Sequence, residues 1–275
     1  MRTCSTCSGG KEQNCCEENQ ESRCDSSCSK GTIYLVGMGP GNPEEMTVHA
    51  TRAIACSEYV VAYKTYIELL SPGLLMGKEI ISTGMMGEVE RCKEAVRIAC
   101  TGKKVSVVSS GDAGIYGMSG LVLEILQAEG RLDQVNIEMV PGVTAAQAAA
   151  AVLGAPLMND FAVLSLSDLL TPLDKIMRRA EAAASGGFVT ALYNPKSVSR
   201  TENIEKVREI FLKHRPADTL VGIVKNALRS NEKVIVSTLD RFIHEDIDMF
   251  TMVIIGNEDT KSIGDYLVTV RGYSL

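Results

Sequence analysis

The alternation of short β-branched runs with stretches of helical periodicity, which begins at Gly31, most constrains the fold of this chain. Such alternation is typical of parallel strands joined by crossover helices. In the first half the predicted strands cover 32–38, 58–63, 104–110 and 135–140, and the predicted helices cover 44–57, 87–101 and 117–129. We therefore predict an open α/β sheet for this part of the chain.

A second alternating series follows the alanine-rich helix predicted at AAQAAAAVLG, which Gly154 closes in a C-cap position. Its predicted strands cover 160–167, 187–193, 219–224, 232–239 and 248–256, and its predicted helices cover 172–184 and 199–214. The last three strands have no long helix between them, so we expect mixed strand directions in the second sheet. We place the domain boundary near Pro141 and predict two α/β domains, 31–142 and 143–275.

Length and charge narrow the function. The 275 residues are enough for two domains that each bury a core. The net charge of -6 provides no basic field to attract nucleic acid. The most hydrophobic long segment, MVPGVTAAQAAAAVLGAPLM, is interrupted by proline, glycine and glutamine, and the N-terminus lacks the apolar region of a secretory signal. We expect a cytoplasmic protein that binds neither membranes nor nucleic acid.

Residues 1–30 form a cysteine-rich tail with almost no large apolar side chains, so they cannot fold unaided. Its six thiols, with the spacing C-x2-C-x7-C-C-x7-C-x3-C, are Cys4, Cys7, Cys15, Cys16, Cys24 and Cys28. Thiolates suit zinc, cobalt or an iron-sulfur cluster, although this spacing matches no iron-sulfur signature. Two hypotheses stay open: a metal-binding tail, or a disordered tail without a defined site.

The first glycine-rich loop, VGMGPGNP, follows the first predicted strand. A dinucleotide fingerprint would need glycine at Asn42, and Pro40 removes a backbone donor that a pyrophosphate would use. The small residues instead allow a ligand to approach the backbone closely, with Asn42 or Thr47 capping the next helix. The alternative is a strand-to-helix turn that binds nothing.

The second loop, SSGDAGIYGMSG, follows another strand of the same predicted sheet. Two such loops at strand ends indicate a crevice at a topological switch point, where α/β proteins bind ligands. Asp112 is its only charged residue and either contacts a ligand or closes a local Asx-turn. The third loop, VPGVTAAQAAAA, places Thr144 as a helix cap before an alanine face, which suits close backbone packing or a flat ligand.

Basic residues follow several predicted strands: Lys64, Lys196, Arg200, Lys225 and Arg229. Gathered at one cleft, they would favour a ligand with several negative charges, whereas each alone is typical of a solvated surface. His49, His214 and His244 have no metal-ligand spacing, and no nucleophile elbow, Walker loop or H-E-x-x-H is present in the sequence. Hydrolase and kinase functions therefore lack their usual motifs.

Together the three loops resemble the tetrapyrrole (corrin and porphyrin) methyltransferase family, in its order and at its spacing, from about residue 32 to about residue 257. The segments LSLSDLLTP, ALYNPKSVSR and VGIVKNALR resemble the branch that methylates C-17 of a cobalamin precursor during ring contraction. The resemblance implies two α/β domains with the cofactor cleft between them, S-adenosylmethionine as cofactor, a tetrapyrrole substrate and a homodimer.

The resemblance also implies which residues hold the cofactor: Pro40, Ser110, Gly111, Asp112, Ile115, Thr144, Ala145, Tyr193, Asn194, Asn226 and Ala227. The macrocycle carries acetate and propionate groups, so the five basic residues named above are the predicted substrate contacts. On this hypothesis Arg200→Ala weakens tetrapyrrole binding more than cofactor binding. Ring contraction asks for an acid or base, for which Asp112, Ser167 and Asp168 are the candidates.

Two other hypotheses for the function remain open from the sequence alone. The chain could belong to the same family but methylate another ring carbon, which the position of the new methyl group would reveal. It could instead be a metal carrier or redox protein that works through the cysteine-rich tail, in which case deletion of residues 1–30 would abolish its activity.

Overall fold

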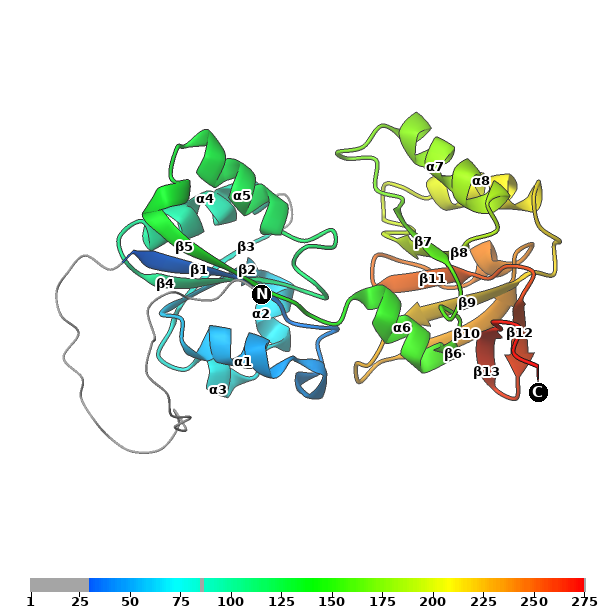
Figure 1. The fold of residues 1–275 in the computed structure, drawn as a ribbon, viewed down its shortest axis with the longest axis horizontal. Coiled ribbons are helices and arrows are strands. Elements are labelled where there is room, and N and C mark those ends of the chain that lie inside the picture. Colours follow the sequence, from blue (N-terminus) through cyan, green and yellow to red (C-terminus); the bar gives the residue numbers. More distant parts are fainter. Residues whose placement is uncertain (1–29, 85–86, 275) are drawn as a thin grey trace.

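The computed structural model describes residues 30–84 and 87–274, which form two α/β units side by side (Figure 1). The metal site predicted at the six N-terminal cysteines lies outside these residues. The first unit ends with strand β5, and residues 141–144 connect it to helix α6 of the second unit. Within the described ranges no helix is long and apolar enough to cross a membrane.

The first unit is built on a five-stranded sheet with the order β3-β2-β4-β1-β5. Its strands are β1 (Gly31–Gly37), β2 (Tyr59–Tyr63), β3 (Glu79–Thr83), β4 (Lys104–Ser109) and β5 (Val135–Val140). Every neighbouring pair is parallel, with Ile33 of β1 opposite Val105 of β4 and Ile137 of β5. The carboxyl ends of all five strands therefore lie at one edge of the sheet, and the prediction of an open α/β sheet is confirmed.

Helices cover both faces of this sheet (Figure 1). They are α1 (Val48–Ala55), α2 (Lys64–Leu69), α3 (Pro72–Leu75), α4 (Glu88–Ala99) and α5 (Ser119–Ala128), with short 3-10 turns at Pro43–Glu45 and Leu132–Gln134. Leu35 and Val107 pack with the α4 and α5 side, whereas Val36 and Val108 pack with the α1 side. This alternation explains why the strands read as continuous apolar runs, since a parallel strand buried on both faces needs no polar side.

The second unit is built on a sheet with the order β10-β9-β11-β8-β7. Its strands are β7 (Phe161–Ser165), β8 (Val189–Tyr193), β9 (Leu220–Lys225), β10 (Lys233–Thr238) and β11 (Thr251–Ile255). β7 and β8 are parallel, whereas β11 is antiparallel to both β8 and β9, and β10 is antiparallel to β9. The predicted mixture of strand directions is therefore confirmed.

One face of the second sheet packs against α7 (Leu173–Ser185) and α8 (Asn203–Leu212). The other packs against α6 (Ala145–Leu153) and strand β13 (Tyr266–Thr269), which pairs with β12 (Thr260–Ile263) and β6 (Gly154–Ala155). A 3-10 turn covers Phe242–His244. Gly154, the predicted C-cap of the alanine-rich helix, has φ +123°, which explains the need for glycine there.

The structure differs from the sequence prediction in several elements. The helix expected over 44–57 begins at Val48, because Asn42 and Thr47 each cap a separate turn, through the backbone N–H groups of Glu44 and Ala50. The helix expected from 199 begins at Asn203. Elements α2, α3, β3, β6, β12 and β13 were not predicted, since they are short or carry no clear alternation.

Candidate functional site

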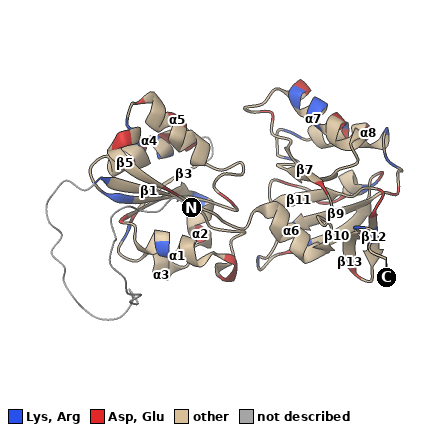
Figure 2. Cartoon of the chain, viewed as in Figure 1, with Lys and Arg blue, Asp and Glu red and all other residues tan. Residues whose placement is uncertain are grey.

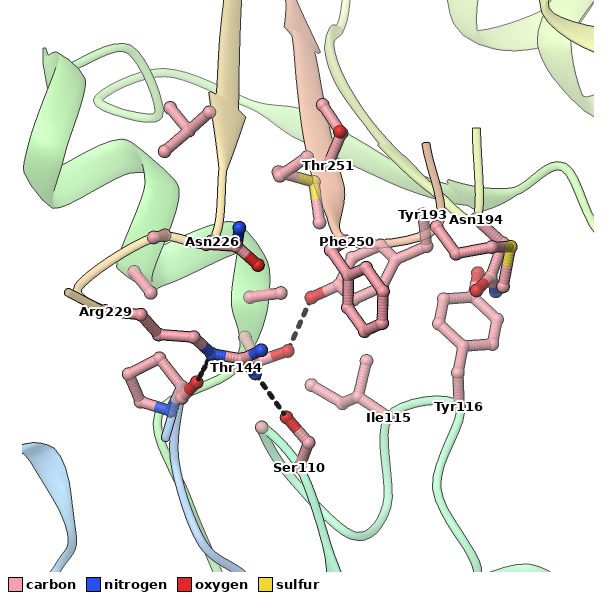
Figure 3. A pocket seen from close by; sticks show the side chains of 18 of the residues that line it. Ser110, Ile115, Tyr116, Thr144, Tyr193, Asn194, Asn226, Arg229, Phe250 and Thr251 are labelled. Carbon is pink, nitrogen blue, oxygen red and sulfur yellow. Dashed lines mark hydrogen bonds between the residues drawn. The ribbon is translucent and has the colours of Figure 1, made fainter. Parts of the chain in front are cut away.

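A cavity of about 240 Å³ lies between the two units, at the edge where the glycine-rich loops emerge (Figure 3). All the residues predicted to hold a cofactor line this cavity except Asp112. The lining residues that were not predicted are Tyr63, Thr65, Tyr66, Tyr116, Ala148, Val224, Met249, Phe250, Thr251 and Met252, and the predicted substrate residue Arg229 also lines it. The wall therefore consists mainly of backbone, small side chains and aromatic rings.

The three glycine-rich loops supply their part of the wall as closely packed main chain. Gly39 and Gly111, with φ values of +75° and +70°, pair through two hydrogen bonds of 3.0 and 2.7 Å between their backbone groups. A Cβ on Gly142 would lie 2.2 Å from the Gly111 carbonyl oxygen, and one on Gly37 would lie 2.7 Å from the same atom. Since real Cβ atoms do not approach backbone this closely, the three loops can assemble only with glycine at these positions.

Asp112 links two of these loops and does not line the cavity. One carboxylate oxygen accepts the Gly114 N–H at 2.8 Å, and the other accepts the Gly142 N–H at 3.0 Å. Asp112 was predicted to contact the cofactor and to act as an acid or base, with a local Asx-turn as the alternative. The structure places it in the Asx-turn. Because both oxygens accept backbone hydrogen bonds, Asp112 stabilises the relative position of the second and third loops.

Tyr193, at the end of β8, caps the helix that follows the connection between the units. Its hydroxyl oxygen accepts the Ala146 N–H at 3.0 Å and forms a hydrogen bond with the Thr144 hydroxyl. Thr144 is the N-cap residue by position, but its side chain makes no capping bond, so Tyr193 takes the capping role. The Tyr116 ring from the first unit packs on Tyr193 with ring centroids 5.1 Å apart, and its hydroxyl donates to the Val163 carbonyl oxygen at 3.5 Å.

Arg229 spans the cavity from the second unit to the first (Figure 3). Its Nε donates to the Pro40 carbonyl oxygen and its Nη2 to the Ser110 hydroxyl at 3.4 Å. Burial lowers the pKa of Arg229, and the Tyr66 hydroxyl is the acidic group that opposes this shift. A guanidinium whose charge is only partly compensated inside a cavity favours a ligand with a carboxylate.

Backbone strain is concentrated at this cavity. In the part of the chain that the structure describes, four non-glycine residues have φ in the left-handed region: Tyr116, Asn194, Asn226 and Leu228, at +54°, +49°, +53° and +59°. Three of them line the cavity, and Leu228 lies between the lining residues Ala227 and Arg229. Such conformations carry a cost of about 1–3 kcal/mol each and cluster at ligand sites.

The other predicted site residues do not line the cavity. The Lys225 ammonium lies 2.9 Å from Asp246 and 2.8 Å from Asp248, and these hydrogen bonds raise its pKa, so its charge is already compensated. Lys64 is the exposed first residue of α2, and Lys196 is half-buried after β8. Arg200 is only 8% exposed, with Ser167 and Asp168 beside it. The exposed clamp predicted from the five basic residues is therefore not found for Arg200 or Lys225.

Some missed residues follow from the same rule that selected Lys64. Tyr63 is the last residue of β2, and Tyr66 lies in α2, which follows directly. Both therefore lie at the same sheet edge as the glycine loops. Met249 and Phe250 precede β11, which runs antiparallel to its neighbours, so its amino end reaches the cavity. The sequence carried no signal for this pair because the strand direction was not known.

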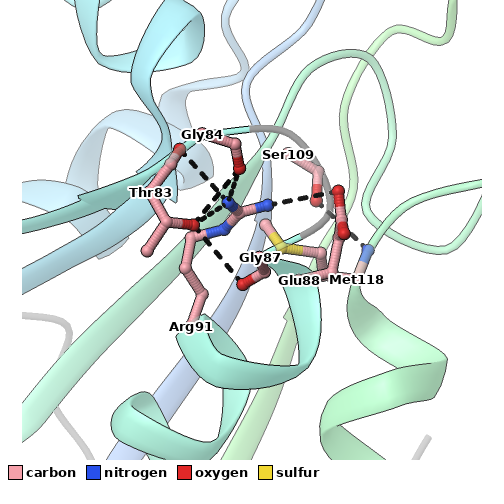
Figure 4. A network of polar contacts seen from close by, with 7 residues as sticks. All are labelled: Thr83, Gly84, Gly87, Glu88, Arg91, Ser109 and Met118. Carbon is pink, nitrogen blue, oxygen red and sulfur yellow. Dashed lines mark hydrogen bonds and ion pairs between the residues drawn. The ribbon is translucent and has the colours of Figure 1, made fainter.

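A buried arginine supports the first unit beside the cavity (Figure 4). Arg91 of α4 is 2% exposed and donates to the Gly84 carbonyl oxygen at 3.0 Å, the Thr83 carbonyl oxygen at 3.3 Å and the Thr83 hydroxyl. Its guanidinium carbon lies 6.0 Å from the centroid of the Tyr63 ring, which lines the cavity. Arg91 therefore connects the end of β3 to the cavity wall. Across the described ranges, no group of three or more His, Cys, Asp or Glu side chains is placed to hold a metal.

Two α/β units with a cavity lined by aromatic rings and one arginine, between glycine-rich loops, correspond to a known class of methylases. Residues 32–243 match the family Tetrapyrrole (Corrin/Porphyrin) Methylases, and the chain belongs to this family.

Two curated relatives support this assignment. The chain is 47% identical over 246 residues to the cobalt-factor III methyltransferase of Priestia megaterium. These residues make up 89% of this chain but only 45% of that protein. It is 44% identical over 243 residues to the probable cobalt-factor III C(17)-methyltransferase of Salmonella typhimurium, covering 88% of this chain and 100% of that protein. The chain thus spans less than half of the first relative and all of the second.

Two solved structures share the fold. The methyltransferase CobJ superposes with a TM-score of 0.83 at 33% identity, over 87% of this chain and 100% of CobJ. The cobalt precorrin-4 methyltransferase CbiF superposes with a TM-score of 0.66 at 26% identity, over 82% of this chain and 94% of CbiF. The two α/β units are therefore the architecture of this family.

Proposed function

We propose that this chain is an S-adenosylmethionine-dependent methyltransferase that acts at C-17 of a cobalt-factor III type tetrapyrrole in cobalamin biosynthesis. The observation that carries this proposal is the end-to-end similarity, at 44% identity, to a relative named for that reaction. The cavity adds independent support, because the motif residues from which the resemblance was inferred come together around it.

The cavity wall fits a sulfonium donor. The rings of Tyr66, Tyr193 and Phe250 line it, and aromatic faces attract a cation without a competing negative charge. Arg229 uses Nε and Nη2 for Pro40 and Ser110, and we propose that its Nη1 donates to the carboxylate of an amino acid portion. When bound, S-adenosylmethionine supplies the methyl group and carries the positive charge that the transfer disperses.

The chain's own contribution is alignment and the exclusion of water. The glycine loops and the side chains of the second unit fix where a donor can lie. Correct alignment of two reactants lowers the activation barrier by up to about 7–11 kcal/mol. An electron-rich ring carbon attacks without prior deprotonation, so the methyl transfer itself needs no general base. Ser167 and Asp168, on the loop after β7, remain our candidates for proton transfer during ring contraction.

The acceptor, with several carboxylates, is proposed to bind at the mouth of the cleft. Helix α7 carries three basic residues, Lys175, Arg178 and Arg179, and the Lys and Arg positions of its ribbon lie at the end nearer the first unit (Figure 2). One of them, Arg179, is close enough to Tyr116 to oppose the rise in the pKa of Tyr116 that burial produces. Lys64 and Lys196 remain proposed contacts because, among the described residues, neither forms an ion pair, whereas two carboxylates hold Lys225. A homodimer, as the family resemblance implies, and a cytoplasmic location, as expected from the sequence, complete the proposal.

Calorimetry provides the first test. The full chain should bind S-adenosylhomocysteine with a stoichiometry of about one and should show no heat with NAD. Incubation with S-adenosylmethionine and a cobalt-factor III preparation should then give a product methylated at C-17, identified by NMR. Methylation at another carbon would instead support the other-ring-position hypothesis, and binding of NAD alone would contradict the proposal.

A further inference from the structure

Arg200 lies directly behind the cavity wall formed by the second unit. Its side chain is 8% exposed, so the guanidinium does not face the open cleft. Nη2 donates to the Asn194 carbonyl oxygen at 3.1 Å and lies 3.5 Å from the Met249 sulfur. Both Asn194 and Met249 line the cavity, and they come from different strand ends. One buried side chain therefore contacts two parts of the wall from behind.

Asn194 needs support from outside its own backbone. Its φ of +49° lies in the left-handed region, which residues other than glycine adopt at a cost that is smaller for asparagine than for most. The next residue is Pro195, and proline further restricts the backbone of the residue before it. Two contacts oppose this strain: Arg200 binds the Asn194 carbonyl oxygen, and the Asn194 amide donates to the Ser165 hydroxyl at 3.0 Å.

The other contacts of Arg200 keep it in place. Nη1 donates to the Ser167 hydroxyl at 3.5 Å, and the Asp168 carboxylate lies 3.9 Å away, at the outer limit of an ion pair. Residues 197 and 200 form a turn through their backbone groups, at 2.9 and 3.3 Å. This turn directs the guanidinium back toward the end of β8, so the loop after β8 folds onto its own first residue.

We propose that Arg200 is a positioning residue for donor binding, which holds Asn194 in its left-handed conformation and Met249 against the same wall. This inference rests on the proposed function, because it assigns the donor to the cavity. It replaces the expectation that Arg200 clamps a carboxylate of the substrate. Loss of Arg200 should weaken binding of the donor itself, although Arg200 does not touch the cavity.

The test compares S-adenosylhomocysteine binding to four full-length proteins by calorimetry: wild type, Arg200→Ala, Arg200→Lys and Arg208→Ala. Arg208 is the matched control, since it also donates to backbone carbonyls, those of Leu239 and Asp240, on the side of the second unit formed by α8. Arg200→Ala should raise the dissociation constant by about tenfold or more, because a charge-assisted hydrogen bond is lost. Arg208→Ala should change it by less than about twofold. Arg200→Lys, which retains one charged donor, should lie between them.

A double substitution separates positioning from a general loss of stability. Glycine adopts positive φ without a Cβ penalty, so Asn194→Gly removes the strain that Arg200 opposes. Adding Arg200→Ala to Asn194→Gly should therefore raise the dissociation constant by a smaller factor than Arg200→Ala does alone. If Arg200→Ala does not fold, Arg200→Lys decides alone, and an unchanged affinity in that variant overturns the proposal.

Other outcomes are equally informative. Unchanged S-adenosylhomocysteine affinity in Arg200→Ala, with weakened binding of a carboxylate-bearing cobalt porphyrin, would overturn positioning in favour of direct substrate contact. Equal factors in the single and double substitutions would also overturn it. Failure of the wild-type chain to bind S-adenosylhomocysteine would contradict the proposed function instead, so the two failures are distinguishable.

Discussion

The two units form opposite walls of one cavity by different means. The glycine-rich loops of the first unit contribute main chain, packed so closely that a Cβ on Gly37 or Gly142 would meet backbone, beside the rings of Tyr63, Tyr66 and Tyr116. The second contributes side chains on strained backbone, with Asn194 and Asn226 at positive φ without being glycine. A wall made of glycine is rigid through steric exclusion, whereas a wall of strained asparagines depends on the hydrogen bonds that hold it. The two walls should therefore respond differently to substitution.

The largest effect is expected from Gly142→Ala in the glycine wall. The new Cβ would lie 2.2 Å from the Gly111 carbonyl oxygen and 2.6 Å from Gly37, so backbone has to move. We expect S-adenosylhomocysteine binding to fall by about a hundredfold or more, corresponding to roughly 3 kcal/mol. Calorimetry together with thermal unfolding measures this.

Gly120→Ala is the matched control for that substitution, because nothing lies within 4 Å of its Cβ position in helix α5. Alanine is the better helix former, so this variant should be more stable by about 0.5–1 kcal/mol. Equal binding by both variants would show that the glycine wall is not set by steric exclusion.

Arg91→Ala tests whether the glycine wall also depends on a side chain. Removal of a 2% exposed arginine leaves the carbonyls of Thr83 and Gly84 without their donor and opens a cavity, which should lower the free energy of unfolding by about 2–3 kcal/mol. Urea unfolding measures this loss. Arg97→Ala, in the same helix but with an exposed side chain, should unfold as wild type does.

Binding by the Arg91→Ala protein sharpens the comparison further. Arg91 does not line the cavity and its guanidinium carbon lies 6.0 Å from the centroid of the Tyr63 ring, which does, so the folded variant should bind S-adenosylhomocysteine with a loss smaller than that of Arg200→Ala. A larger loss would mean that the first unit, like the second, holds its wall through a buried arginine.

Asn226 tests the strained wall directly. At φ +53°, alanine has no amide to stabilise the left-handed conformation, while glycine adopts it freely. Asn226→Ala should weaken S-adenosylhomocysteine binding by about tenfold, and Asn226→Gly by less, if backbone conformation matters more than the amide group. The reverse order in a calorimetric comparison would show that the Asn226 amide contacts the ligand itself.

The same contrast explains what the sequence could predict. The glycine loops were identified because glycine is required where a side chain would clash, and most strands of the two five-stranded sheets, though not β3 or their order in the sheet, followed from the alternation of apolar runs. Asn194 and Asn226 entered only through the family resemblance, since asparagine also occurs in many unstrained positions. Arg200 and Lys225 were expected at an open cleft because both follow strands. Arg200 instead binds Asn194, and Lys225 binds Asp246 and Asp248. These contacts form only in the folded chain, so the sequence alone carries no sign of them.

Tyr193→Phe should have the smallest effect of the series, because it keeps the ring that faces the cavity and removes only the hydroxyl. That hydroxyl accepts the Ala146 N–H and pairs with Thr144, so the first turn of α6 loses its cap. We expect a loss of about 1 kcal/mol in stability and a change of at most about threefold in S-adenosylhomocysteine affinity. In a Thr144→Ala background the same substitution should cost less, since one partner is already absent. Additive losses in urea unfolding would mean that the Thr144 and Tyr193 hydroxyls do not act as one cap.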